Sequence, residues 1–186
     1  MKRFLPLLII PLACCFFISC SKDTTGAINS VQRGDSLKAN TAANSSFVFY
    51  SFANHAIVAN SDSASTNWDI GLRGTTFILN SHASGPGNAG VVIQHINYDD
   101  VATAPDTGYA YDTSATQKAI KDGAWYSFNA GTNTFTLVTP QTFIFRTAVG
   151  YYTKMEISSM YFDPLAPTKL VYQFRFNYQV LGGRDF

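Results

Sequence analysis

The sequence has 186 residues, of which 13 are lysine or arginine and 12 are aspartate or glutamate, so the formal net charge is only +1. A chain this close to neutrality lacks the basic surface that phosphate contacts need, which excludes the nucleic-acid-binding classes. Aromatic residues make up 15% of the chain, including 15 phenylalanines and 10 tyrosines, and this is enough apolar area for one substantial core.

The N-terminus has the features of a bacterial lipoprotein signal. Lys2 and Arg3 precede an apolar stretch over residues 4–18, which at 15 residues is short for a membrane span and normal for a signal peptide. The stretch ends in FISC, which resembles a lipobox. We therefore predict a signal peptide over residues 1–19 and a lipidated Cys20 as the first mature residue, with ordinary secretory cleavage nearby as the alternative.

The mature chain begins with a polar stretch. Residues 21–46 contain no aromatic side chain and no hydrophobic period, so residues 20–46 are predicted to be a lipidated cysteine followed by a flexible tether. Cys14 and Cys15 fall in the predicted signal peptide, which excludes a disulfide within the mature domain. The Ser-Lys-Asp after Cys20 partly resembles the surface-export signal of Bacteroidetes lipoproteins. We expect a lipid-anchored outer-membrane protein on the cell surface, with a periplasmic orientation as the alternative.

Residues 47–186 are predicted to form one all-β domain, since 140 residues suit a single core. The strongest strand signal is at residues 170–180, where apolar and polar side chains alternate. Further strands are predicted in FVFYSF, NWDIGLRGTTFILN, VVIQHI, NTFTLVT, TFIFRT and YYTKMEISSMYF. We expect antiparallel sheets packed as a sandwich or a flattened barrel, with at most one short helix, in residues 113–123.

Residues 85–90 read GPGNAG, which has the glycine spacing of a dinucleotide-binding turn. That motif requires a buried strand before it and a helix after it. Here turn-forming residues precede the glycines, and the β-branched run VVI follows them. The glycines are therefore not expected to bind a nucleotide.

The strand-forming segments together resemble one known family. In chain order they are NWDIGLRGTTFILN, SHASGPGNAGVV, VATAPDTGYAYD, GAWYSF, TFIFRTAVGYYTKMEISSMY and LVYQFRFNYQV. This combination resembles the HmuY family of Bacteroidetes haem-binding lipoproteins over about residues 47–180. The resemblance implies capture of haem or a related porphyrin, for uptake through a TonB-dependent receptor. It also implies that Gly85, Gly87 and Gly90 lie in a connector between strands, where they allow positive-φ turns and close backbone approach.

The family holds haem iron between two axial His or Met side chains on two loops. By resemblance these loops are residues 112–123 and 129–133, and neither contains His or Met. Since iron accepts His, Met, Cys or Tyr, the candidate haem ligands elsewhere are His82, His95 and Met160. The competing interpretations are a solvated loop residue for His82 and a buried core histidine for His95. Met160 is predicted to lie on the exposed face of its strand, with Lys154 and Glu156, where it could reach a ligand. Haem could also be held by apolar contact with weak or single ligation.

No pattern in the sequence predicts catalysis or a metal site. Ser-His-Asp, H-E-x-x-H and C-x-x-C arrangements are absent, and Glu156 is the only glutamate. The alternative to haem capture is a non-enzymatic surface module that binds a glycan or a partner protein on the same fold. Trp68 and Trp125 would then be the stacking platforms for sugar rings, unless both belong to the core.

Overall fold

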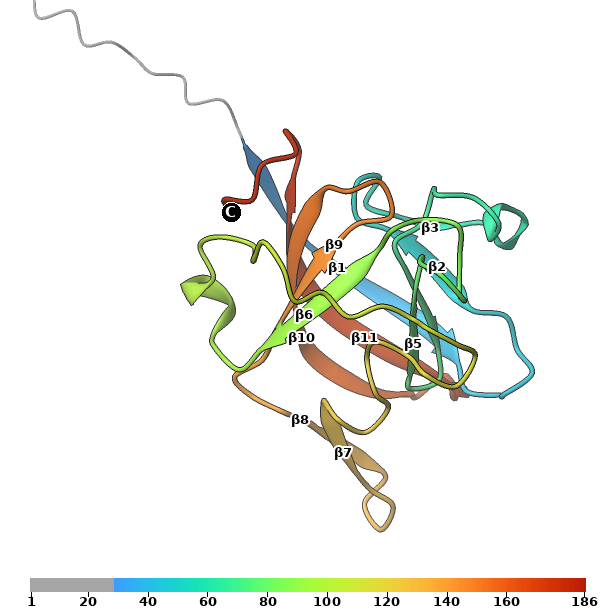
Figure 1. Ribbon diagram of the computed structural model, residues 1–186. Helices are drawn as coiled ribbons and strands as arrows, with labels where there is room; N and C mark the ends of the chain where they lie inside the picture. The colour runs from blue at the N-terminus through green and yellow to red at the C-terminus, as the bar shows by residue number, and fades with distance from the viewer. Residues whose placement is uncertain (1–28) are drawn as a thin grey trace, which may run out of the picture.

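The alternating apolar residues of the chain form antiparallel strands in a computed structural model that describes residues 29–186 (Figure 1). None of the helical segments in this range has the length and hydropathy of a membrane span. The two 3₁₀ turns are η1 (Asn60–Asp62) and η2 (Tyr98–Asp100). The strands are β1 (Ser30–Asn40), β2 (Val48–Ser51), β3 (Ala56–Val58), β4 (Ile70–Arg73), β5 (Thr76–Leu79), β6 (Gly90–Gln94), β7 (Tyr126–Asn129), β8 (Thr134–Leu137), β9 (Thr142–Arg146), β10 (Tyr152–Asp163) and β11 (Ala166–Gln179).

The strands build two facing sheets and one separate hairpin. The larger sheet has the order β1-β11-β10-β9-β6, the smaller has the order β3-β2-β4-β5, and β7 pairs only with β8. Buried side chains from the larger and the smaller sheet meet in one core between the two sheets. No strand pairing joins the edges of the two sheets within residues 29–186, so the all-β sandwich prediction is confirmed and a closed barrel is not formed.

β11 supplies the centre of the core, as its alternation predicts. Tyr172, Phe174 and Phe176 point inward and are at most 5% exposed. Tyr50 of the facing sheet packs edge-on against Phe174 and Phe176, with ring centroids 5.5 and 6.1 Å apart. Edge-to-face pairs contribute about 0.5–1.5 kcal/mol each beyond the area they bury, so the aromatic residues hold the two sheets together.

The prediction of a flexible tether over residues 20–46 is wrong from residue 30 onward. β1 pairs with β11 along its whole length, from Ser30 opposite Gln179 to Asn40 opposite Lys169. Only two apolar side chains of β1, Leu37 and Ala39, are buried in the core, because an edge strand can be held by its backbone ladder with few apolar residues. The domain therefore begins before residue 47, while the signal peptide and Cys20 lie outside the described residues.

The predicted helix in residues 113–123 is also wrong. The Ser114 hydroxyl accepts hydrogen bonds from the backbone N–H groups of Thr116 and Gln117, and this closes a local turn. Serine favours such turns because its side chain competes with helical hydrogen bonding. Ile120 is then buried at 2% exposure, so packing holds the segment as an ordered loop.

The glycine segment connects the two sheets and is followed by β6, as expected, and not by a helix. A Cβ atom on Gly85 would lie 2.2 Å from Oδ1 of Asn80 and 2.7 Å from the Trp68 ring, so the close-approach role is confirmed. The expectation of positive φ is wrong at Gly85, Gly87 and Gly90, none of which lies in the left-handed region. These glycines serve packing and not turn geometry.

Candidate functional site

Two adjoining spaces open beside the turn between β4 and β5. The first, here called the hairpin hollow, has a volume of about 360 Å³ and lies under the β7–β8 hairpin. The second, called the loop hollow, has a volume of about 660 Å³ and lies beside residues 115–122. Arg73 and Thr76 line both spaces, so they adjoin there, and we refer to them together as the paired hollow. Figure 1 shows the hairpin projecting from the body of the sandwich.

The hairpin hollow has an aromatic wall. Three phenylalanine rings pack against one another there: the ring centroid of Phe135 in β8 lies 4.6 Å from that of Phe128 and 5.3 Å from that of Phe162, and the last two are 6.0 Å apart. Tyr126 packs 5.6 Å from Phe135 and continues inward to the buried Trp125 at 4.7 Å. Phe128 is 44% exposed although it is apolar, so part of this wall faces solvent. Such a surface can receive a flat apolar ligand.

A buried carboxylate holds the loop that lines the loop hollow. Asp112 is fully buried, and its two oxygens accept hydrogen bonds from the backbone N–H groups of Leu79 and Ala119, both at 2.9 Å. The Lys118 ammonium lies 3.8 Å from the same carboxylate and donates to the Ser84 hydroxyl at 2.8 Å. Asp112 therefore fixes the loop to β5.

Cations outnumber anions around the paired hollow. Arg73, Lys118 and Lys121 line it, against Asp122 as the lining carboxylate. Neither Arg73 nor Lys121 forms an ion pair with any residue in the described range 29–186. Arg73 is held in place by cation–π contact with the Phe47 ring, 4.3 Å from its centre. The rim of the space is therefore suited to anionic groups.

The structure does not bring the three predicted haem ligands together. His82 is exposed, and its ring lies 5.1 Å from that of Tyr111, near the start of β6. His95 directly follows the other end of β6 and is exposed, so its interpretation as a buried core histidine is wrong. His82 lies in the loop before β6 and His95 follows β6, so the whole strand stands between them along the chain. Neither histidine lines the paired hollow.

Met160 is buried at 5% exposure, which contradicts its predicted place on an exposed face. A register irregularity in β10 between Ile157 and Ser159 shifts the alternation by one residue, so Met160 turns into the core opposite Tyr172. It packs in the core and does not line the paired hollow.

The two tryptophans are also core residues. Trp68 is fully buried and Trp125 is 2% exposed, so neither offers a flat face to a sugar. Trp68 donates its indole N–H to the Ser63 carbonyl at 2.9 Å, which fixes its orientation.

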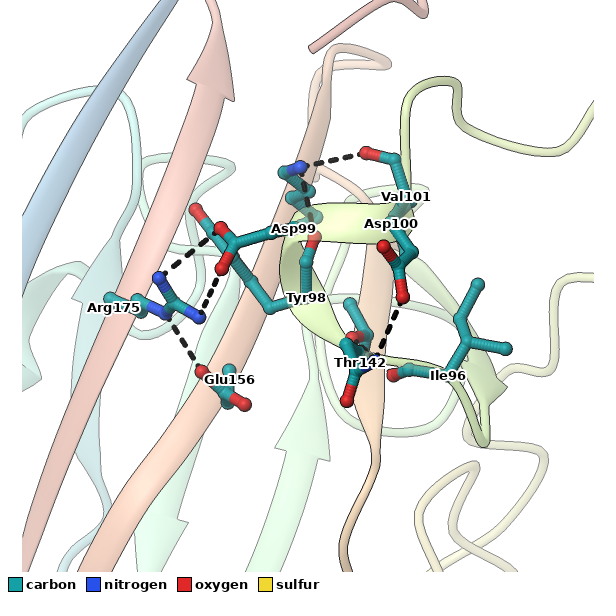
Figure 2. Close-up of polar contacts among 10 residues, drawn as sticks. Ile96, Tyr98, Asp99, Asp100, Val101, Thr142, Glu156 and Arg175 are labelled. Carbon is teal, nitrogen blue, oxygen red and sulfur yellow. Dashed lines mark hydrogen bonds and ion pairs between the residues drawn. The ribbon is translucent and has the colours of Figure 1, made fainter.

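A polar cluster covers the outer face of the larger sheet, where η2 crosses it (Figure 2). Arg175 pairs with Glu156 at 2.7 Å and with Asp99 at 3.1 Å, and its guanidinium lies 4.2 Å from the centre of the Tyr98 ring. Lys154 is 6% exposed and donates to two backbone carbonyls of the η2 segment, at 3.0 and 2.7 Å. Burial lowers the pKa of Lys154. Because these groups are engaged with one another, the cluster is a clamp that holds η2 on the sheet.

Residues 29–186 contain no group of three or more His, Cys, Asp or Glu side chains placed to hold a metal ion.

Comparison with known proteins identifies similar folds. No family model matches the sequence, and no curated protein matches it. Among solved structures, PinO from Porphyromonas gingivitis in its apo form superposes with a TM-score of 0.53 at 12% identity, covering 79% of this chain and 97% of PinO. A protein from Bacteroides vulgatus described as HmuY-like and haem-binding gives a TM-score of 0.51 at 11% identity, covering 77% of this chain and 90% of that one. At these identities the similarity is one of fold, and it confirms the HmuY-like fold expected from the sequence.

Proposed function

We propose that this protein captures haem or a related porphyrin in the paired hollow, without catalysing a reaction on it. The composition of that space carries the proposal. Aromatic side chains form one wall, and two cations without an acidic partner in residues 29–186, Arg73 and Lys121, lie at the rim. A porphyrin matches both features, because its faces are apolar and its edge carries carboxylates. The fold similarity to a protein described as haem-binding supports the same ligand class.

The dimensions of the paired hollow also support this ligand class. Its two parts measure about 360 and 660 Å³, within the roughly 300–1,000 Å³ typical of small-molecule sites. The two parts meet at Arg73 and Thr76, so one flat ligand could contact the hairpin and the loop at once. Residues from the stretch 115–122 line the loop hollow, and this stretch falls within residues 112–123, one of the two segments that correspond by resemblance to the ligand loops of the HmuY family; the other segment, residues 129–133, does not line the paired hollow.

We further propose that the protein works from the outer membrane, held by a lipid on Cys20 and delivering its ligand to a TonB-dependent receptor. The support is the basic and apolar N-terminal stretch that ends in FISC. Since β1 begins at Ser30, the chain between Cys20 and the domain has nine residues, which span at most about 30 Å. The domain would then stay close to the membrane surface.

Absorption spectroscopy tests the proposed function. Titration of the full chain with ferric haem should give a saturable change in the Soret band at one equivalent. Phe128→Ala should weaken binding, because the exposed 44% of a phenylalanine side chain, about 90 Å², contributes about 2 kcal/mol when a ligand covers it. That energy corresponds to roughly 30-fold in Kd.

Val149→Ala is the matched control, since Val149 is an apolar residue that is 58% exposed and does not line the paired hollow. Its Kd should equal that of the unmodified chain. A spectrum identical to free haem at every ratio would refute the proposed function.

A further inference from the structure

We infer that the paired hollow recognises the faces and carboxylates of the macrocycle and gives the central metal no protein ligand, so that metal-free porphyrin binds about as tightly as haem. This inference rests on the proposed function and specifies its ligand class. It departs from the expectation that two axial side chains hold the iron.

The lining of the paired hollow is poor in groups that bind iron. Its members are threonine, alanine, arginine, glycine, phenylalanine, leucine, glutamine, lysine, isoleucine, aspartate and one tyrosine. Of the residue types that bind haem iron axially, namely His, Met, Cys and Tyr, only Tyr126 is present among them. His82, His95 and Met160 lie elsewhere in the fold.

Tyr126 is already committed to another partner. Its hydroxyl donates a hydrogen bond to Oδ1 of Asp122 at 2.7 Å, and Thr75 donates to the other oxygen of that carboxylate at 3.0 Å. Burial and the hydrogen bond to Asp122 raise the pKa of Tyr126, although Thr75 has the opposite effect. Iron ligation needs the phenolate, whereas this environment keeps the proton on the phenol. The ring is also held by Trp125, 4.7 Å away.

The groups that remain are suited to a dianionic aromatic ligand. Phe128, Phe135 and Phe162 provide apolar contact for the ring faces. Arg73 donates to the Ser45 carbonyl at 3.3 Å and stacks on Phe47, so its guanidinium is preorganised at the point where the two spaces meet. A preorganised guanidinium loses little entropy when it binds a carboxylate.

The test compares three probes on the full chain: ferric haem, protoporphyrin IX without metal, and the dimethyl ester of protoporphyrin IX. We expect the Kd values of the first two to agree within about threefold, and the ester to bind about tenfold or more weakly. Lys121→Gln and Arg73→Gln should each raise the Kd of ferric haem and of protoporphyrin IX several-fold and leave the Kd of the dimethyl ester unchanged. Arg33→Gln is the control, since Arg33 is an exposed cation on β1 that does not line the paired hollow. Lys121 is exposed, so its variant tests the carboxylate contact without a change in folding.

The outcomes separate this inference from the function it rests on. Haem binding 30-fold or more tightly than metal-free porphyrin, with the difference removed by Tyr126→Phe, would overturn the inference and leave haem capture standing. An ester that binds as tightly as the diacid would also overturn it. If neither haem nor porphyrin binds, the proposed function fails and the inference fails with it.

Discussion

The buried carboxylate of Asp112 offers a quantitative test of how the site is held. Asp112→Ala removes the acceptor of two backbone N–H groups, those of Leu79 and Ala119, and the ionic partner of Lys118. A buried donor left without an acceptor costs about 1–3 kcal/mol. Water can reach Ala119, which is only partly buried, so the total should be about 3 kcal/mol. For a domain of this size that is a decrease in Tm of about 6–12 °C.

Thermal unfolding followed by circular dichroism measures this change. Asp112→Asn keeps the side-chain volume and one hydrogen-bond acceptor, so the decrease in Tm should lie between those of the unmodified chain and Asp112→Ala. Asp62→Ala is the control, because Asp62 is exposed and its substitution should change stability by no more than about 0.5 kcal/mol. If Asp112→Ala has the same Tm as the unmodified chain, the free-energy cost of burying the carboxylate outweighs the gain from its hydrogen bonds. The role assigned to Asp112 would then be wrong.

Three further predictions concern the scaffold. Burial raises the pKa of Asp69 to about 6, although two backbone N–H groups that donate to its carboxylate lower it in part. The folded protein therefore keeps a proton on Asp69 that the unfolded chain loses near pH 4. The free energy of unfolding should therefore fall by about 2 kcal/mol as pH rises from 4 to 7, and denaturant titrations should show no such fall for Asp69→Asn. Leu37→Ala should lower the free energy of unfolding, measured in urea, by about 2–5 kcal/mol, because Leu37 is buried in the core. An unchanged free energy of unfolding would mean that β1 is not part of the folded domain. Gly85→Ala should lower Tm by several degrees because its Cβ would clash at 2.2 Å, whereas Gly34→Ala, with 3.8 Å of clearance, should not; equal melting temperatures would contradict the packing role.

The strand pattern and fold class could be predicted because side-chain alternation reports which face of a strand is buried. β11 is the strongest example, since aromatic residues occupy its core face from Tyr172 to Tyr178. β1 escaped prediction because its backbone pairing with β11 provides most of its contacts, and pairing leaves little trace in hydrophobic periodicity. Met160 was misplaced for a related reason, since a register shift in β10 reverses the alternation after Ile157.

The binding site was harder to predict than the fold. Its walls combine residues far apart in the chain, such as Arg73 from β4, Phe135 from β8 and Phe162 from β10. None of them belongs to a recognisable ligand-binding motif, and each alone is typical of a strand residue. The resemblance to the HmuY family pointed to residues 112–123, part of which lines the loop hollow, and to residues 129–133, which do not line the paired hollow; the aromatic wall and the cations Arg73 and Lys121 depend on tertiary packing.

Hydrogen exchange with and without porphyrin tests the location of the ligand most directly. Binding in the paired hollow predicts slower exchange for amides in residues 113–123 and in β7 and β8, which surround it. Amides of the η2 clamp, on the outer face of the larger sheet, should exchange at unchanged rates. Protection confined to η2 or to the His82 loop, with none at the hairpin, would contradict the assignment of the site.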